Sequence, residues 1–381
     1  MQISDISRVV GPTLSRQLYM LAKQYDDVID FTLGDPDIHT PVAICEAANK
    51  AAIGGQTRYA PNAGIPELRD AIAAYYSKKS KVAFGPNNVA VTVGATEAIY
   101  LAFNAILNQG DEVIIFEPYW VQYENIVRLF GAKPVIVSQF ADGFVPEIDA
   151  IESAVTEKTK VIIINSPNNP SGQIYDEQFL RGIARIAVDN DLYVFADEVY
   201  CSLVYEDEYP SIVPLCPKEN LVVFNSFSKQ FAMTGWRVGY VLAESQVIDT
   251  IVKLQQNIAV CASTISQKAA YEAIIHAEDY SLSIKDEFLH RRDVLVRELE
   301  GCLGISYNIP QGTFYLFLNI SVTKMDSKTF CFSLLSQEHV ATIPGIAFGV
   351  HSDSFVRLAF TLDDNKLVEG AHRIKHFLSQ I

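Results

Sequence analysis

The six cysteines of this 381-residue sequence stand far apart, and no two of them form a Cys-x-x-Cys pair. Neither a zinc ribbon nor a thioredoxin-like redox site is therefore expected, and scattered reduced thiols are the default. No apolar run approaches the ~20 residues that span a bilayer, and the first residues lack the basic and apolar regions of a signal peptide. These absences predict a cytoplasmic protein without a membrane partner.

The chain also lacks a basic block, and its formal net charge is −15 with a pI near 4.9. This charge argues against nucleic acid and anionic membranes as partners, so an anionic ligand must meet a local cationic pocket. His372 and His376 stand four positions apart, a spacing used by metal ligands, but no third ligand is evident and no metal is predicted. Hydrophobic residues make up 49% and charged residues 20%, as in ordinary globular proteins of one or two domains.

Short apolar runs alternate with segments of helical periodicity between residues 86 and 242. Strands that alternate with helices are typical of a mostly parallel sheet covered on both faces. We therefore predict an α/β fold whose large domain has a mostly parallel seven-stranded sheet between helices. The predicted strands are Val89–Val93, Val113–Phe116, Pro134–Val137, Val161–Asn165, Tyr193–Asp197, Leu221–Asn225 and Val238–Leu242.

The remaining segments predict a smaller α+β domain. Residues 305–381 alternate between strand and helix signals, and residues 248 to about 302 are long and helical. Near the N-terminus, Phe31–Asp37 is predicted as a strand that ends in a Gly/Pro turn. We divide the chain into an N-terminal arm with part of the small domain (1–44), a large domain (45–285) and a C-terminal small domain (286–381).

A lysine follows one of the predicted strands, close to where its apolar run ends. Lys229 comes after Leu221–Asn225 and two serines, Ser226 and Ser228, and Arg237 follows eight residues later. Burial lowers the pKa of a lysine, and only the neutral amine is a nucleophile, as a Schiff-base lysine requires. Two hydroxyls and an arginine nearby suit a phosphate. The stretch therefore predicts a lysine that holds an aldehyde cofactor with a phosphate, namely pyridoxal phosphate.

Two other interpretations of this lysine stay open on the stretch alone. Lys229 is equally compatible with a surface position in a loop. Ser226-x-x-Lys229 also matches the serine–lysine motif of penicillin-binding enzymes, but that class needs Ser-Asp-Asn and Lys-Thr-Gly elements, which the sequence lacks.

Polar or aromatic residues follow other predicted strands in the same way, and in such sheets ligands bind beyond the carboxyl ends of the strands. Thr96 offers an anion site at a helix start, or is a simple N-cap. Trp120 stacks on a planar ring or packs in the core, and Asn169 donates to a ligand or belongs to a surface turn. Asp197, followed by Tyr200, meets a cation or caps a helix. Each is ambiguous alone, but together they indicate one ligand site.

From about Gly34 to the C-terminus the chain resembles the class I aminotransferases, which are pyridoxal-phosphate enzymes of fold type I. Ser171 and Gln230 depart from residues common in that family, and the first 30 residues match less well. The motifs that carry the resemblance are Gly34-x-Pro36-Asp37, Tyr59 with Gly64-x-x-x-Leu68-Arg69, Gly94-Ala95-Thr96-Glu97-Ala98, Pro118-Tyr119-Trp120, Asn169-Pro170-x-Gly172, Asp197-x-x-Tyr200, Ser226-x-Ser228-Lys229, Gly235-Trp236-Arg237-x-Gly239-Tyr240, Pro344-Gly345-x-x-Phe348-Gly349 and Arg357-Leu358.

The resemblance implies a catalytic role for three of these residues. Lys229 would form an aldimine with the cofactor and then move the substrate proton. Asp197 would keep the ring nitrogen protonated, so that the ring accepts electrons. Tyr200 would hydrogen-bond the ring oxygen.

It also implies binding roles for the others. Arg357 would clamp the substrate α-carboxylate beside the Gly34 backbone and Asn169. Tyr59 would reach the phosphate in the neighbouring subunit of a homodimer with shared active sites. The other expected cofactor contacts are the stacking Trp120, the ring-oxygen donor Asn169 and the phosphate ligands Ala95, Thr96, Ser226, Ser228 and Arg237.

The expected activity is transfer of an amino group from an L-amino acid to a 2-oxo acid, with 2-oxoglutarate or a similar compound as acceptor. A lyase that breaks a Cβ–S or Cγ bond on the same cofactor is the alternative. A cofactor-sensing regulator is a third, but it predicts a fused DNA-binding segment for which this acidic chain has no room. The residues expected to contact the substrate side chain are Thr13, Leu14, Leu33 and Gln255–Ser263.

Overall fold

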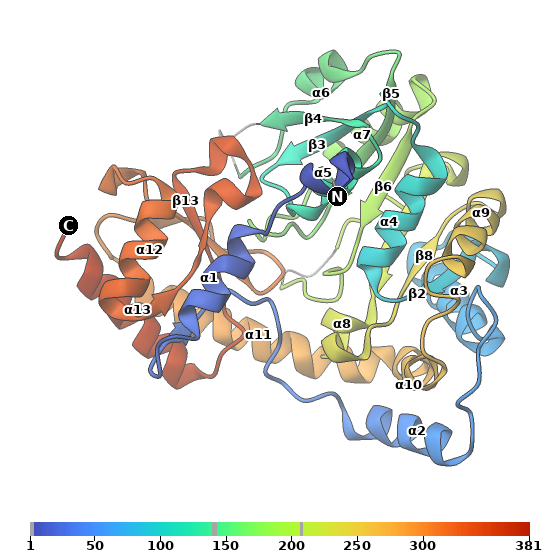
Figure 1. Cartoon of the computed structure of the whole chain (residues 1–381), viewed down its shortest axis with the longest axis horizontal. Helices are drawn as coiled ribbons and strands as arrows, with labels where there is room; N and C mark the ends of the chain where they lie inside the picture. The colour runs from blue at the N-terminus through green and yellow to red at the C-terminus, as the bar shows by residue number, and fades with distance from the viewer. Residues whose placement is uncertain (1–3, 139–142, 206–208) are drawn as a thin grey trace.

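The computed structural model describes residues 4–138, 143–205 and 209–381. Figure 1 shows a large sheet flanked by helices and, beside it, a smaller group of helices and strands that contains the C-terminal part of the chain. The first three residues of the predicted N-terminal arm lie outside the described part. No helix of the described residues is long and apolar enough to cross a membrane.

The large sheet has seven strands in the order β2-β8-β7-β6-β5-β3-β4, which confirms the predicted α/β architecture. Neighbours from β7 to β4 run parallel, while β8 is antiparallel to both β2 and β7. All seven predicted strands are present, within two residues at either end. Their bounds are β2 Val89–Thr92, β3 Glu112–Glu117, β4 Lys133–Ser138, β5 Thr159–Asn165, β6 Tyr193–Asp197, β7 Leu221–Ser226 and β8 Gly239–Leu242.

The strand residues alternate between two apolar cores, one on each face of the sheet. In β5, Val161 and Ile163 belong to one core and Ile162 and Ile164 to the other. Helices α4 (Ala95–Ile106), α5 (Gln122–Leu129) and α9 (Ser245–Gln256) cover the first face. The opposite face is covered by α2 (Val42–Ile53), α3 (Pro66–Ser80), α6 (Ile148–Ala154), α7 (Glu177–Asp189) and α10 (Thr264–Ile275).

A separate apolar core joins the N-terminal segment to the C-terminal part of the chain. Leu18 and Phe31 pack with residues of β10, α12 and α13 in this core. The division at residues 44 and 285 stays a prediction, because α11 crosses the second boundary. The elements here are α1 (Leu14–Ala22), α11 (Ala277–Leu299), α12 (Ser327–Glu338), α13 (Asp364–Leu378), β9 (Ser306–Tyr307), β10 (Tyr315–Asn319), β11 (Val340–Ala341), β12 (Ile343–Pro344) and β13 (Phe355–Ala359).

The strand predicted at Phe31–Asp37 is wrong in its position. The strand in this region is β1 (Ile29–Asp30), which pairs in parallel with β11. After Phe31 the chain is irregular, and its carbonyl oxygens accept from side chains: Arg357 reaches Thr32, Thr361 reaches Leu33, and Lys229 reaches Gly34. These bonds replace those of a sheet and hold the segment against the C-terminal part of the chain, through Arg357 and Thr361, and against the large domain, through Lys229.

Candidate functional site

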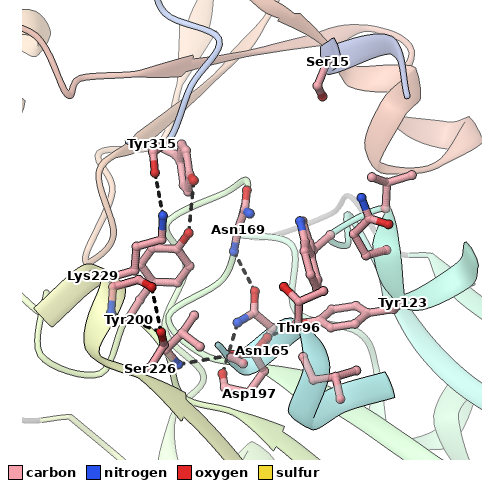
Figure 2. Close-up of a pocket in the computed structure, with 18 of the residues that line it drawn as sticks. Ser15, Thr96, Tyr123, Asn165, Asn169, Asp197, Tyr200, Ser226, Lys229 and Tyr315 are labelled. Carbon is pink, nitrogen blue, oxygen red and sulfur yellow. Dashed lines mark hydrogen bonds between the residues drawn. The ribbon is translucent and has the colours of Figure 1, made fainter. Parts of the chain in front are cut away.

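A cavity of about 340 Å³ lies beyond the carboxyl ends of the parallel strands, where such sheets bind ligands. It is bordered by the large sheet, by the N-terminal segment and by β10 and β13 (Figure 2). All but one of the predicted site residues line it. They are Gly34, Ala95, Thr96, Trp120, Asn169, Asp197, Tyr200, Ser226, Ser228, Lys229, Arg237 and Arg357.

The Lys229 amine points into this cavity from the short helix α8 (Phe227–Gln230), which begins where β7 ends. Its Nζ donates to the Gly34 carbonyl oxygen at 2.6 Å. Burial lowers the pKa of Lys229 to about 8; Arg357 and Arg237 also lower it, whereas Asp35 opposes the shift. About a tenth of this amine is therefore neutral at pH 7, far more than for an exposed lysine, and able to act as a nucleophile.

The close approach of Gly34 to the site requires a residue without a side chain. A Cβ at Gly34 would lie 1.9 Å from the Tyr315 hydroxyl oxygen. The glycine therefore lets the carbonyl that meets Lys229 and the Tyr315 side chain occupy the same small region.

Asp197 ends β6 and lies at the floor of the cavity, 5% exposed. The Tyr123 hydroxyl donates to its Oδ2, and the Val199 N–H donates to Oδ1 at 3.2 Å. Burial raises the pKa of Asp197 to about 6 despite these two donors. A buried carboxylate of this kind is stabilised by a cation, and a protonated ring nitrogen has the required charge.

Backbone N–H groups and hydroxyls lie together where helix α4 begins at the cavity wall. Helix α4 begins here with Ala95 and Thr96 after Gly94, whose φ of 80° suits a glycine. Ser226 and Ser228 lie near this end, their Oγ atoms 2.9 Å apart. A Cβ at Gly94 would lie 2.6 Å from an Arg237 nitrogen, so the missing side chain leaves room for the guanidinium. A helix N-terminus with hydroxyls and one arginine suits a phosphate.

Arg357, on β13, is 6% exposed and faces the cavity beside Asn169. Its Nη1 donates to the Asn169 Oδ1 at 3.0 Å, and its Nη2 donates to the Thr32 carbonyl oxygen at 2.7 Å. The buried Nε has no acceptor among the described residues. A substrate carboxylate would supply one.

Two tyrosines in the cavity wall were not identified from the sequence. Tyr123 stands three residues after Trp120 and bonds Asp197, while Tyr315 lies with its hydroxyl 3.0 Å from that of Tyr200. The predicted stacking residue, Trp120, makes an edge contact with Tyr123 at 5.3 Å between ring centroids. The position of Tyr123 three residues after Trp120 could have indicated it, but no local pattern pointed to Tyr315.

Some expected positions lie outside this cavity. Tyr59 is 86% exposed on the surface of the chain, so its expected action in a neighbouring subunit stays a prediction. Thr13 and Leu33 line the cavity as expected, whereas Leu14 and residues 255–263 do not. The described residues contain no group of three or more His, Cys, Asp and Glu side chains that could hold a metal.

These features fit one kind of ligand. A partly neutral lysine, a buried carboxylate in need of a cation, a phosphate-binding end and an arginine with an unused donor match pyridoxal phosphate together with a substrate carboxylate. The fold and the site thus define an enzyme that forms a Schiff base with this cofactor.

Comparison with known proteins places the chain more narrowly. The model of the family "Aminotransferase class I and II" matches residues 26–374. An aspartate aminotransferase from Pyrococcus horikoshii is 40% identical over 95% of this chain and 94% of its own length, and one from Thermotoga maritima is 37% identical over 99% and 98%. The structure of an aspartate aminotransferase from Thermus thermophilus with maleate has a TM-score of 0.94 at 34% identity, covering 99% of both chains.

The chain belongs to the class I and II aminotransferases. It has the fold type I architecture, depends on pyridoxal phosphate and transfers amino groups between amino acids and 2-oxo acids.

Proposed function

We propose that this transfer takes place in the cavity around Lys229 and Arg357, and that each of the lining residues has a defined task. The observation that carries the proposal is that a lysine of lowered pKa and an arginine with a buried, unused N–H face the same cavity. Pyridoxal phosphate, when bound, supplies an aldehyde for the amino group and a ring that accepts the electrons released when the substrate loses its Cα proton.

Lys229 acts as the general base at the substrate Cα. Its pKa of about 8 lies close to neutral pH, which favours both uptake and release of a proton. The carbonyl of Gly34 accepts from the amine and holds it on one side of the cavity. The same lysine attaches the cofactor between turnovers.

Arg357 binds the α-carboxylate that amino acids and 2-oxo acids share. Its two Nη atoms are held by Asn169 and Thr32, which fix the plane of the guanidinium. Because the fork is fixed before binding, little side-chain freedom is lost when the carboxylate arrives. One clamp then serves both substrates in turn.

Asp197 holds a positive charge on the cofactor ring, and Tyr123 and Val199 orient its two oxygens. Tyr200 and Asn169 would hydrogen-bond the ring oxygen, and Trp120 would stack on the ring, since all three line the cavity. Ala95, Thr96, Ser226, Ser228 and Arg237 hold the phosphate, because the N-terminus of α4 and the serines gather at one end of the cavity.

The chain functions as a cytoplasmic homodimer in which Tyr59 completes the partner's phosphate site. An exposed fraction of 86% suits a residue that acts outside its own subunit. Residues 1–44 and 286–381 together form the small domain, and residues 45–285 the large one, in keeping with the separate core that joins α1 to α12 and α13.

A spectral half-reaction tests the transfer. Addition of a donor amino acid to the holoenzyme should convert the aldehyde form to the amine form, release one equivalent of oxo acid without ammonia, and be reversed by an oxo acid such as 2-oxoglutarate. Lys229→Ala is the control and should lose the conversion. Ammonia released with pyruvate would instead support the lyase alternative, for which no feature of the site argues specifically.

A further inference from the structure

Three cationic side chains line the cavity in the described part of the chain, and each already has a task. They are Lys229, Arg237 and Arg357, and the single acidic residue of the lining is Asp197. Lys229 acts as the base, Arg237 binds the phosphate, and Arg357 binds the α-carboxylate. None is left for a second carboxylate on the substrate.

The residues outside the described part do not change this count. Residues 1–3, 139–142 and 206–208 contain no lysine, arginine or histidine. Arg16, next to the lining residue Ser15, lies with its guanidinium 5.2 Å from the ring centre of Tyr19 on its own helix, and Arg128 is paired with Glu124. Within one subunit, the described residues that line the cavity include no lysine or arginine beyond these three.

The part of the cavity near the N-terminal arm is uncharged. Ser15 lies above the cavity in Figure 2, at the opposite end from Asp197. The Thr13 hydroxyl there accepts from the Arg16 N–H, and neither it nor Ser15 carries a charge. Leu33, Val121 and Phe348 also line the cavity, and Leu33 is 39% exposed. An apolar side chain placed here would cover exposed apolar surface.

A second carboxylate in this region would lose water without gaining a cation. The first turn of α1 borders the region, but a helix N-terminus supplies only part of a charge. We propose that the cavity selects amino acids and 2-oxo acids with an uncharged, mainly apolar side chain. This inference rests on the proposed function, because it assumes that Arg357 holds the α-carboxylate.

The inference separates this chain from what the names of its relatives suggest. Aspartate carries a second carboxylate, and so does maleate, which is bound in the Thermus thermophilus structure. The inference also predicts that a 2-oxo acid with an apolar side chain is a better acceptor than 2-oxoglutarate, the acceptor predicted from the sequence.

Binding of unreactive carboxylates to the holoenzyme tests the inference without turnover. Maleate has two carboxylates, whereas 3-phenylpropanoate has one carboxylate and an apolar group. Calorimetric titration of each, together with the shift of the cofactor absorbance, should give a Kd for 3-phenylpropanoate at least tenfold below that for maleate. Maleate binding as tightly as 3-phenylpropanoate, or more tightly, would overturn the inference.

A charge placed at the uncharged end gives a second readout. Ser15→Lys should tighten maleate binding at least tenfold and leave 3-phenylpropanoate within about threefold, while the neutral Ser15→Gln should change neither by more than that. An unchanged preference in a Ser15→Lys holoenzyme with normal cofactor absorbance would count against the inference. If that variant does not fold, the wild-type comparison decides.

Two further variants separate this inference from the function on which it rests. Arg357→Gln should lose both ligands, because both use the α-carboxylate clamp. If neither ligand binds the wild-type protein, the proposed role of Arg357 fails and the inference fails with it. If the wild-type protein prefers maleate and Arg58→Gln abolishes that preference, the cation next to Tyr59 binds the second carboxylate. That result would also overturn the inference.

Discussion

The Lys229 amine donates to the carbonyl oxygen of Gly34 at 2.6 Å, although 195 positions separate the two residues in the sequence. The bond joins the short helix α8, which follows β7, to the irregular segment after β1. Because β1 pairs with β11 and Phe31 belongs to the C-terminal core, the environment of the lysine depends on both parts of the protein.

The pH dependence of cofactor loading follows from the lowered pKa of Lys229. Only the neutral amine attacks the aldehyde, and the pKa of about 8 sets its fraction. The rate at which the apoenzyme binds pyridoxal phosphate covalently should rise about tenfold per pH unit below pH 8 and level off above it. Stopped-flow absorbance between pH 6 and pH 10 measures this profile.

Asp35 allows a second test, because its charge should set the pH at which the loading rate levels off. Its charge raises the pKa of Lys229, so Asp35→Asn should move the midpoint of the profile to lower pH. Lys229→Ala should show no covalent phase. A wild-type rate that continues to rise up to pH 10 would show that the amine keeps the pKa of an exposed lysine.

A second prediction concerns the stability of the apoprotein. Burial raises the pKa of Asp197 from 3.8 to about 6, so the native state binds a proton more tightly than the unfolded chain does. The unfolding free energy therefore falls as pH rises from about 4 to 6, and stays lowered above pH 6. Asp197→Asn removes the buried charge and should stabilise the apoprotein by up to about 3 kcal/mol at pH 8, and by less at pH 5.

The same substitution should weaken cofactor binding, because asparagine cannot form an ion pair with a protonated ring nitrogen. Urea unfolding of both apoproteins at pH 5 and pH 8, alongside a titration with pyridoxal phosphate, would measure the two effects. If Asp197→Asn is less stable than wild type at pH 8, burial of the charged Asp197 carboxylate does not lower the unfolding free energy of the apoprotein.

The strand-end residues of the site could be predicted from sequence because the strands are buried on both faces. Such strands are continuous apolar runs, and the change to polar residues after Ile164, Ala196 and Phe224 marks where the sheet ends. Asn169, Asp197 and Lys229 could thus be placed at one edge without a structure.

The other parts of the site depend on packing that no local pattern encodes. The Tyr200–Tyr315 contact joins positions 115 residues apart, and the bond from Arg357 to Thr32 uses a carbonyl, which every residue has. The position of β1 was missed because its two residues are a strand only by pairing with β11. Propensity over so short a segment carries little information.

Tyr123 gives a prediction about a residue that acts through Asp197. Its hydroxyl is the side-chain donor to Oδ2, and a hydrogen bond to a charged group typically contributes about 1.5–3 kcal/mol. Tyr123→Phe should therefore raise the pKa of Asp197 further and weaken pyridoxal phosphate binding by roughly tenfold or more. Equilibrium titration with the cofactor measures the change.

Tyr175→Phe is the matched control, because Tyr175 is equally buried but belongs to the core on the other face of the sheet. It should leave the cofactor affinity within about twofold of wild type. Equal effects of the two substitutions would mean that Tyr123 contributes packing rather than its hydrogen bond.

Arg357→Lys provides the last prediction, since it keeps the charge but removes the planar fork. An ammonium group cannot bond Asn169, Thr32 and a carboxylate with the geometry that the guanidinium offers. We expect kcat/KM for the donor amino acid to fall at least about 100-fold, mostly through KM, with the cofactor absorbance unchanged. Arg291→Lys, at a buried arginine that pairs with Asp37 and Glu287, is the control and should change KM little. A fall in kcat alone, with KM unchanged, would mean that Arg357 does not hold the substrate carboxylate in the ground state.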